Sequence, residues 1–288
     1  MLIRKLFALA VLLPGLCWFS LWTAFPGEAF PAVTETLEVF VGSASQPATE
    51  EVASRFEELT GIRSHLHFGG SGKMLSEMRI SGRGDLYFPG SSDFMDLAKR
   101  EKLVLEGTEK IVVYLIPAIN VPAGNPKEIH SLQDLTRSGL KIGLARPDTV
   151  STGLLWAEIL EESGLSDRVR KNIKVHTPSI AKTVQLISLN VVDAILGLRV
   201  FTYWNPDKIE TIPLRPEQVP RIAYIPIAVS SLSKKRETAQ LFIDFLISDE
   251  GRAIYRRWNY LVTLEEARRF ALPGALVGGT WNLPESWK

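Results

Sequence analysis

Short apolar runs alternate along the chain with longer segments whose apolar residues recur at helical spacing. Short runs bounded by glycine or proline are typical of buried strands, and the longer amphipathic segments are typical of helices. The pattern predicts strands at residues 37–41, 62–68, 85–88, 111–116, 140–144, 173–175, 194–196 and 222–229, and helices at residues 47–60, 73–80, 92–99, 154–163, 180–189, 237–248 and 250–258. Regular alternation of strand and helix implies an α/β fold with open, mostly parallel sheets and helices on both faces.

The order of these elements indicates two lobes joined by a hinge. We expect residues 36–115 and 222–262 to form the first lobe and residues 116–221 the second, with 263–288 as a C-terminal extension. Ligands of open parallel sheets bind at the carboxyl ends of the strands, where turns lead into helices. Two such lobes facing each other across a cleft form a hinge-closing binding protein.

The first 29 residues have the pattern of a secretory signal peptide. Arg4 and Lys5 precede an apolar stretch, and small residues at Gly27 and Ala29 fit a cleavage site after Ala29. An alternative is a retained membrane anchor, since about 20 apolar residues can span a bilayer. Either interpretation places the rest of the chain outside the cytoplasm, in the periplasm. The only cysteine, Cys17, lies in this leader, so the mature chain would have no disulfide.

Composition and charge exclude several classes of partner. The chain has 288 residues, of which 45% are hydrophobic and 9% aromatic, as expected of a globular protein with buried cores. Cutting after Ala29 removes Arg4, Lys5 and Glu28 from 33 basic and 32 acidic side chains, which leaves equal numbers of each sign. Nucleic acids and anionic membranes select basic surfaces, so we expect neither as a partner. Any bound anion must then be held by local groups.

Four turns between a predicted strand and a predicted helix are rich in small or hydroxyl residues. They lie at residues 42–45, 69–72, 150–153 and 177–180. The start of a helix has unpaired N–H groups and a partial positive charge, so it binds anions without a cation. Glycine permits close approach of the backbone, and serine or threonine adds hydroxyl donors. A site built of donors favours a fully deprotonated oxyanion.

Several segments of the chain resemble a known protein family. Three segments are similar to periplasmic molybdate- and tungstate-binding proteins of ABC importers: residues 37–40 with the turn that follows, residues 68–72 and residues 84–88. A fourth segment, residues 239–251, is similar to the C-terminal helix of type II solute-binding proteins in general. The resemblance extends over residues 37–258. It implies a monomeric, non-enzymatic carrier without a cofactor, which binds molybdate or tungstate and docks on a membrane permease.

The resemblance also implies which residues bind the oxyanion. Ser71 matches a serine donor, and the first-turn serine is either Ser43 or Ser45, of which we prefer Ser43 because it follows Gly42. Thr152 and Ile180 match positions that contribute backbone N–H groups.

One departure from the family pattern lies near Gly197. A tyrosine hydroxyl is expected there, but the chain reads Gly197-Leu198-Arg199. Arg199 or Tyr203 could replace it, and an arginine would favour a charged oxyanion through paired donors. The alternative is that Arg199 lies on a solvated loop.

Other functions remain as alternatives. One alternative is a protein that binds another ligand, either a sulfate-like anion, or an organic anion or metal ion with His65, Tyr203 and Arg199 as ligands. Another alternative is a membrane-tethered sensor domain. His65 and His67 share one face of a strand, but the pattern shows no third ligand, so we interpret them as partly buried strand residues and assign no metal site. No nucleophile, base and orienting group occur together, so we expect no catalytic residues.

Overall fold

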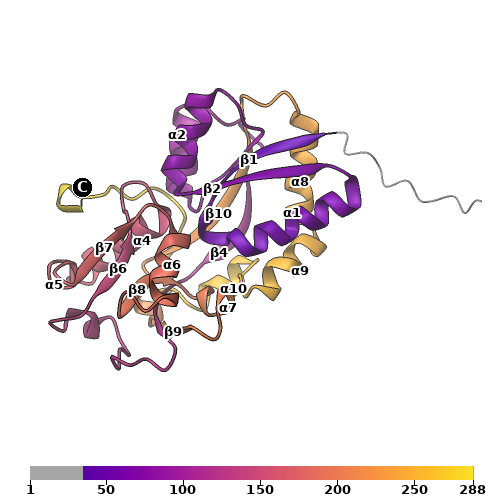
Figure 1. The fold of residues 1–288 in the computed structure, drawn as a ribbon. Helices are drawn as coiled ribbons and strands as arrows, with labels where there is room; N and C mark the ends of the chain where they lie inside the picture. The colour runs from indigo at the N-terminus through magenta and orange to yellow at the C-terminus, as the bar shows by residue number, and fades with distance from the viewer. Residues whose placement is uncertain (1–34, 288) are drawn as a thin grey trace, which may run out of the picture. The chain divides into compact units, whose positions relative to one another are not determined.

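The computed structural model describes residues 35–287 (Figure 1). The predicted signal peptide and Cys17 lie outside the described residues. Within residues 35–287, no helix is both long enough and apolar enough to cross a membrane. The described strands form one six-stranded and one five-stranded sheet.

The six-stranded sheet combines parallel and antiparallel pairs. Strand β1 pairs in parallel with β2 on one side and with β3 on the other, while β10 runs antiparallel to both β3 and β4. The short β11 pairs in parallel with β10. The strands of this sheet are β1 (Thr36–Gly42), β2 (Arg63–Gly69), β3 (Leu86–Phe88), β4 (Lys110–Leu115), β10 (Arg221–Val229) and β11 (Leu276–Val277).

The five-stranded sheet has the order β7-β6-β8-β5-β9. Strand β6 pairs in parallel with β7 and β8, and β5 runs antiparallel to β8 and β9. Its strands are β5 (Pro117–Pro122), β6 (Ile142–Ala145), β7 (Ile173–Thr177), β8 (Ala194–Leu198) and β9 (Ile209–Pro213). Each sheet thus adds antiparallel strands to a parallel set, which strand and helix alternation alone does not predict.

Helices accompany both sheets. With the six-stranded sheet go α1 (Gln46–Thr60), α2 (Ser71–Ser81), α3 (Ser92–Arg100), α8 (Arg236–Ile247), α9 (Asp249–Arg257) and α10 (Leu264–Arg268). With the five-stranded sheet go α4 (Ser151–Glu162), α5 (Ser166–Arg170), α6 (Ile180–Ser188) and α7 (Phe201–Trp204). Single 3-10 turns occur at η1 (Ser43–Ser45), η2 (Gln133–Thr136), η3 (Pro216–Gln218) and η4 (Glu285–Trp287). We call the six-stranded sheet with its helices the first lobe and the five-stranded sheet with its helices the second lobe.

The first lobe is assembled from segments that are distant in the sequence. Figure 1 shows α8 and α9, coloured orange to yellow, beside the indigo α1. Phe56 of α1 packs edge-on against Phe242 of α8, with ring centroids 5.1 Å apart. Burying an aromatic side chain of this size contributes roughly 1.5–3 kcal/mol to stability. The return of the chain to the first lobe, predicted from the order of elements, is therefore held by core packing.

Helices cover both faces of β1, as its sequence requires. Leu37, Val39 and Val41 alternate toward the main core and are fully buried. Phe40 points to the other face, where it packs with Met74 and other residues in a second buried cluster. Strands buried on both faces read as nearly continuous apolar runs, which is why this segment has no clean polar alternation.

Two strands of the second lobe were missed by the sequence analysis. Strand β5 begins at Pro117 and ends at Pro122, where the sequence pattern predicts no strand. Proline is tolerated at the ends of a strand, and the intervening residues pair with β8 on one side and β9 on the other. Strand β9 lies within the proline-punctuated segment from Pro206 to Pro220, where the sequence pattern predicts no strand either.

The chain passes between the lobes at two neighbouring points. Only Ile116 separates β4 of the first lobe from β5 of the second, and Val219 and Pro220 link η3 to β10 on the return. Hinges between lobes are typically a few residues at the ends of such elements.

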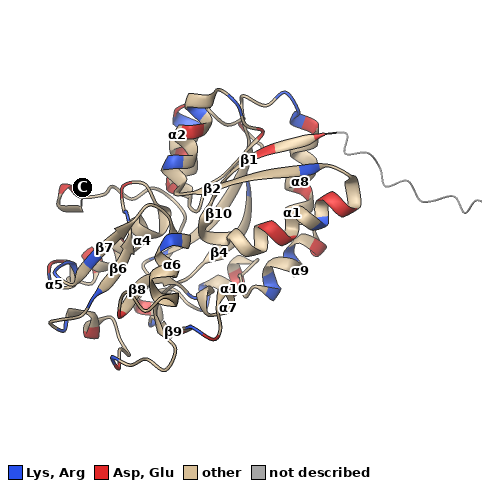
Figure 2. Cartoon of the chain, viewed as in Figure 1, with Lys and Arg blue, Asp and Glu red and all other residues tan. Residues whose placement is uncertain are grey.

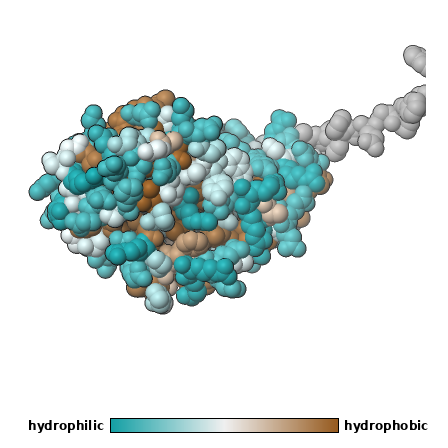
Figure 3. Space-filling model, turned by 90° about the horizontal axis from the view of Figure 1, so that it is seen from below, coloured by the Kyte–Doolittle hydropathy of each residue, from teal (hydrophilic) through white to brown (hydrophobic). Residues whose placement is uncertain are grey.

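Charged side chains are scattered over both lobes with the two signs interspersed (Figure 2), and hydrophilic residues cover most of the face seen in Figure 3. This agrees with the balanced charge of the chain.

Candidate binding site

The starts of several helices meet at one small cavity between the lobes. The cavity is small, with a volume of about 10 Å³, which is the space of about one water molecule. Its lining residues come from the turns that follow β1, β2 and β3 of the first lobe and from the starts of α4 and α6 of the second. They are Gly42, Ser43, Ala44, Gly69, Ser71, Gly90, Val150, Ser151, Thr152 and Ile180. All four turns selected from the sequence therefore contribute at least one residue.

The helix starts at the cavity offer hydrogen-bond donors. Helix α2 begins after Gly70 and α4 after Val150, and neither N-cap residue accepts a hydrogen bond with its side chain. The first-turn N–H groups of these helices are therefore not capped by their N-cap side chains. In α6, by contrast, the Ser179 hydroxyl accepts a bond from the Lys182 N–H. Helices α2 and α4 thus begin without a side-chain cap, although the Gly72 N–H of α2 donates to the Thr149 carbonyl oxygen.

Hydroxyl groups from both lobes meet in the cavity. Ser71 Oγ lies 2.7 Å from Ser151 Oγ, and it also accepts a hydrogen bond of 2.9 Å from the Gly90 N–H. Ser43 Oγ accepts a longer bond of 3.4 Å from the Ala181 N–H of α6. Ser43 and Ser71 each accept from a backbone N–H group, and within the Ser71–Ser151 bond one hydroxyl donates to the other. The hydroxyl protons of Ser43 and of one serine in that pair therefore remain available to donate.

One hydroxyl at the cavity lacks a partner. Thr152 Oγ1 is buried and makes no hydrogen bond within the described chain, although Thr152 lines the cavity. A buried hydroxyl without a partner costs roughly 1–3 kcal/mol. A ligand with acceptor oxygens in the cavity would remove that cost, so Thr152 marks the cavity as a place for such a ligand.

Two glycines permit the close approach around the cavity. A Cβ on Gly42 would lie 2.6 Å from the backbone nitrogen of Gly90. A Cβ on Gly70 would lie 2.7 Å from the Pro178 carbonyl oxygen and 3.0 Å from that of Thr149, both in the second lobe. Any larger residue at these positions would force the backbones apart. The glycines of the sequence motif thus serve contact within and between the lobes.

The lobes are in contact at the cavity. Besides the Ser71–Ser151 bond, the Gly72 N–H of α2 donates to the Thr149 carbonyl oxygen at 3.0 Å. Ser43, Ser71 and Thr152 are each 2–3% exposed. The walls of the cavity are therefore nearly closed to solvent, and a ligand of the size of an oxyanion would enter when the lobes separate.

The lining of the cavity is electrically neutral. None of its lining residues carries a formal charge. An anion here would be stabilised by N–H dipoles and hydroxyl donors in a medium of low dielectric constant, where such dipoles act more strongly than in water. A cation would find no carboxylate among these residues.

The structure brings together only some of the predicted site residues. Ser43, Ser71, Thr152 and Ile180 line the cavity. Ser45 does not: its hydroxyl lies 2.9 Å from Thr49 Oγ1. That threonine in turn lies 3.0 Å from the Tyr255 hydroxyl, so Ser45 faces the core of the first lobe.

Arg199 and Tyr203 also lie away from the cavity. Both line a larger surface pocket beside the hinge. Arg199 donates to the backbone oxygen and the side-chain oxygen of Asn259 at 3.0 and 3.1 Å, and it stacks over the Phe270 ring. Burial lowers the pKa of the Arg199 guanidinium. Arg199 therefore holds the two lobes together near the hinge, and neither residue takes the place expected of the family tyrosine.

The position of that tyrosine is closed by packing. Gly197 lies on β8, where its carbonyl oxygen accepts a hydrogen bond from Trp156 Nε1. A Cβ on Gly197 would lie 2.1 Å from Asn120 Oδ1 and 2.8 Å from the Phe201 ring, so a side chain there would displace both neighbours. Ser151 and Gly90 are the cavity residues that sequence reasoning missed. Ser151 belongs to one of the four turns rich in small or hydroxyl residues, and Gly90 follows a predicted strand. Small residues at the ends of strands are therefore the sequence feature that could have identified both as site residues.

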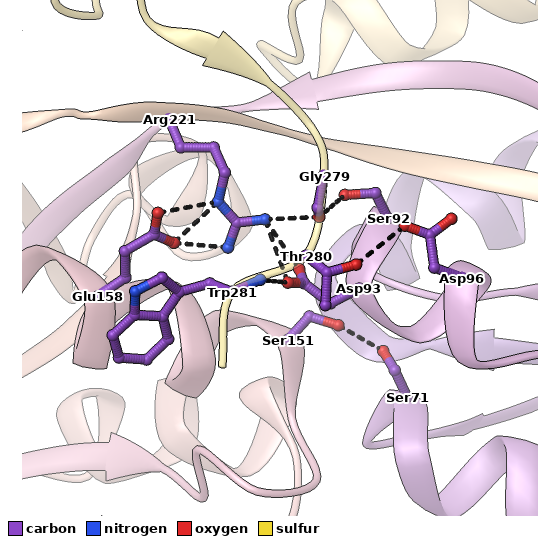
Figure 4. A network of polar contacts seen from close by, with 10 residues as sticks. All are labelled: Ser71, Ser92, Asp93, Asp96, Ser151, Glu158, Arg221, Gly279, Thr280 and Trp281. Carbon is purple, nitrogen blue, oxygen red and sulfur yellow. Dashed lines mark hydrogen bonds and ion pairs between the residues drawn. The ribbon is translucent and has the colours of Figure 1, made fainter. Parts of the chain in front are cut away.

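A buried ionic cluster joins the lobes beside the cavity (Figure 4). Arg221 of β10 donates three hydrogen bonds to Glu158 of α4, two from Nε and one from Nη2, which lies 2.5 Å from Oε2. It also contacts Asp93 of α3 at 3.1 Å. All three residues are at most 7% exposed. Burial raises the pKa of the Glu158 carboxyl, although the hydrogen bonds and the charge of Arg221 act in the opposite direction. The cluster connects α3 and β10 of the first lobe to α4 of the second.

The C-terminal extension passes over this cluster. Arg221 also donates to the Gly279 carbonyl oxygen, and the Trp281 N–H donates to Asp93 (Figure 4). Further along, Trp287 Nε1 donates to Glu161 of α4 at 2.6 Å, and Arg170 of α5 stacks over its ring. The extension is therefore a third connection between the lobes, whereas its Gly278-Gly279 pair and Trp287 had suggested a strap over one lobe.

Comparison with known proteins identifies the class to which this fold and site belong. Residues 37–261 match the family of bacterial extracellular solute-binding proteins, and the chain belongs to that family. A proposed binding protein of Haemophilus influenzae is 25% identical over 223 residues, which cover 77% of this chain and 89% of the relative. The molybdate-binding protein ModA of Mycobacterium tuberculosis is 25% identical over 149 residues, covering 48% of this chain and 57% of that protein.

Solved structures show the same fold. The periplasmic molybdate-binding protein of Azotobacter vinelandii superposes with a TM-score of 0.70 at 15% identity, covering 79% of this chain and 99% of that structure. The sulfate-binding protein SubI of Mycobacterium tuberculosis superposes with a TM-score of 0.69 at 16% identity, covering 85% and 94%. The predicted two-lobed type II fold and the resemblance to molybdate-binding periplasmic proteins are confirmed. The family and these relatives are binding proteins rather than enzymes.

Proposed function

We propose that this protein captures a fully deprotonated tetrahedral oxyanion, molybdate or tungstate, in the cavity between its lobes and delivers it to the membrane permease of an ABC importer. The observation that carries the proposal is the donor lining of the cavity. Serine and threonine hydroxyls and uncapped helix N–H groups converge there without a charged side chain. Molybdate and tungstate have only acceptor oxygens, whereas phosphate at neutral pH carries a proton that needs an acceptor.

Four of the predicted residues form the proposed site. Ser43 and Ser71 donate from their hydroxyls, while Thr152 and Ile180 donate from the backbone N–H groups that open α4 and α6. We add Ser151, whose hydroxyl lies 2.7 Å from that of Ser71. In the proposed complex the oxyanion accepts from both serines in place of their mutual hydrogen bond, and the lobes move apart to make room for it.

We further propose that α4 supplies the donor that the family pattern assigns to a tyrosine. The Thr152 hydroxyl is buried at the cavity without a partner. Together with Ser151 it offers two hydroxyls where the resemblance predicts one phenol. Because α4 begins at the cavity, the short side chains of Ser151 and Thr152 can contact a ligand there. A tyrosine on β8 would not be needed to reach it.

Delivery of the ligand follows from the hinge. We propose that residues 36–115 with 222–262 and residues 116–221 move as the two lobes, with 263–288 as the extension, and that only the closed form docks on the permease. We also propose that the protein is exported to the periplasm and acts there as a monomer. Since ligand and permease act on the same closed state, binding of one favours binding of the other.

A calorimetric titration tests the ligand. Ligand-free protein, prepared by unfolding and refolding, is titrated with molybdate, tungstate, sulfate and phosphate under the same conditions. The proposal predicts one site per chain, with molybdate and tungstate bound more tightly than sulfate and with no measurable phosphate binding. Preference for sulfate would assign the site to the alternative, a sulfate-like ligand. No heat with any of the four would contradict the oxyanion proposal.

A further inference from the structure

Three metal-ligating side chains lie together on the first lobe, away from the oxyanion cavity. Glu38 lies on β1, and His65 and His67 lie on the neighbouring β2. The strands are parallel, with Glu38 opposite His65 and Phe40 opposite His67. Residues two apart on a strand point to the same face, so both histidines lie on the face of Glu38. The third ligand that the sequence pattern lacks therefore comes from an adjacent strand.

The donor atoms of these side chains converge. His67 Nε2 lies 2.5 Å from Glu38 Oε2, and His65 Nδ1 lies 3.2 Å from Glu38 Oε1. One ligand atom from each of the three residues lies within 4.8 Å of the others. Two ligands at about 2.0–2.1 Å from a tetrahedral zinc ion lie roughly 3.3 Å apart, so the three groups need only small side-chain shifts.

The surroundings hold the cluster in place. The His67 ring stacks on Phe40, with centroids 4.7 Å apart and planes inclined by 18°. The Glu38 N–H donates to Asp85 Oδ2 at 2.9 Å, which fixes β1 at that residue. Such supporting contacts orient ligands before a metal binds and lower the entropic cost of binding.

The cluster is open to solvent on one side. The side chains of His67 and Glu38 are 25% and 28% exposed, and that of His65 is 61% exposed. An ion can therefore enter directly, and a water molecule can complete its coordination. Glu38 precedes Gly42 by four residues, or about 13 Å of strand, and none of the three residues lines the oxyanion cavity.

We propose that Glu38, His65 and His67 form a binding site for a divalent transition-metal ion of the zinc class. Two imidazoles and one carboxylate are ligands that such ions prefer, and calcium or magnesium would require more oxygen ligands. The bound ion would cross-link β1 to β2 just upstream of the turn that carries Ser43. The site is independent of the proposed oxyanion function.

Zinc and cobalt titrations of the metal-free full-length protein, prepared without an affinity-tag histidine, test the site. We expect one ion per chain, a higher melting temperature in zinc, and the visible absorption of four-coordinate cobalt. The chain has four histidines, and His130, exposed in a different part of the fold, is the matched control. His67→Ala and Glu38→Gln should each weaken binding at least tenfold, whereas His130→Ala should leave the affinity unchanged.

Two results would overturn the assignment. One is the absence of binding at micromolar zinc, in which case the cluster is only a hydrogen-bonded group. The other is unchanged binding in the His65→Ala/His67→Ala double variant, provided that its melting temperature without metal shows it to be folded. Molybdate affinity, measured on the same variants, should not change, so failure of this site and failure of the oxyanion proposal are separable.

Discussion

The hydroxyl oxygens of Ser71 and Ser151 lie 2.7 Å apart, although Ser71 begins α2 of the first lobe and Ser151 begins α4 of the second. This contact makes the cavity a property of the closed protein, because neither lobe alone brings both hydroxyls together. Separation of the lobes would break the contact and expose two helix starts to water. The same two helix starts are the proposed donors to the ligand, so ligand binding and lobe closure are coupled.

The first prediction concerns the hydroxyls at the cavity. Ser71→Ala and Thr152→Val should each weaken molybdate binding by about tenfold or more, because a hydrogen bond to a charged group contributes roughly 1.5–3 kcal/mol. Calorimetric titration measures the effect. Thr152→Val should not reduce stability without ligand, because the wild-type hydroxyl has no partner within the described chain. Unchanged affinity in both variants would remove these side chains from the site.

The second prediction separates the two candidate serines of the first turn. Ser43 lines the cavity, whereas Ser45 bonds to Thr49 in the core. Ser43→Ala should therefore weaken oxyanion binding with little loss of stability. Ser45→Ala should lower the melting temperature and leave the affinity nearly unchanged. Titration and thermal unfolding of both variants test this, and the reverse pattern would assign the ligand contact to Ser45.

A third prediction concerns closure. A methyl group at residue 70 would lie 2.7 Å from the Pro178 carbonyl oxygen of the second lobe, so Gly70→Ala should hinder contact between the lobes. We expect affinity to fall by at least tenfold and the radius of gyration in small-angle scattering to decrease less on addition of molybdate. Lys73→Ala, on the exposed side of the same helix, is the control. Normal compaction of Gly70→Ala would show that the lobes do not meet as described.

The fourth prediction concerns the buried ionic cluster. Arg221→Met would leave Glu158 and Asp93 buried without their cation, which typically costs about 3–5 kcal/mol. Urea unfolding should show this loss, and the triple variant Arg221→Met/Glu158→Gln/Asp93→Asn should recover much of it. Arg256→Met, which removes an exposed pair with Glu266, should have a much smaller effect. Equal losses for the two single variants would mean that the cluster contributes no more than a surface pair.

Much of the fold follows from local sequence patterns. The apolar run from Leu37 to Val41 and the helix that ends at Gly61 are observed as β1 and α1, within one residue of the predicted bounds. The apolar patterns that indicate these elements depend on residues close together in the sequence, so they can be recognised without the tertiary structure. Strands β5 and β9 were missed because proline at a strand end gives the same local signal as proline in a loop.

The candidate site likewise has features that local sequence patterns predict and others that depend on the tertiary structure. The small and hydroxyl residues at the turns are a local feature, so helix starts rich in donors could be predicted at the ends of the strands. Three other features follow only from how distant segments pack: Ser43 rather than Ser45 reaches the cavity, Arg199 lies at the hinge, and Glu38 joins the two histidines. Each of these depends on strand register or on contacts between lobes. Such contacts join residues far apart in the chain, and packing of the whole molecule selects among partners that local patterns leave equal.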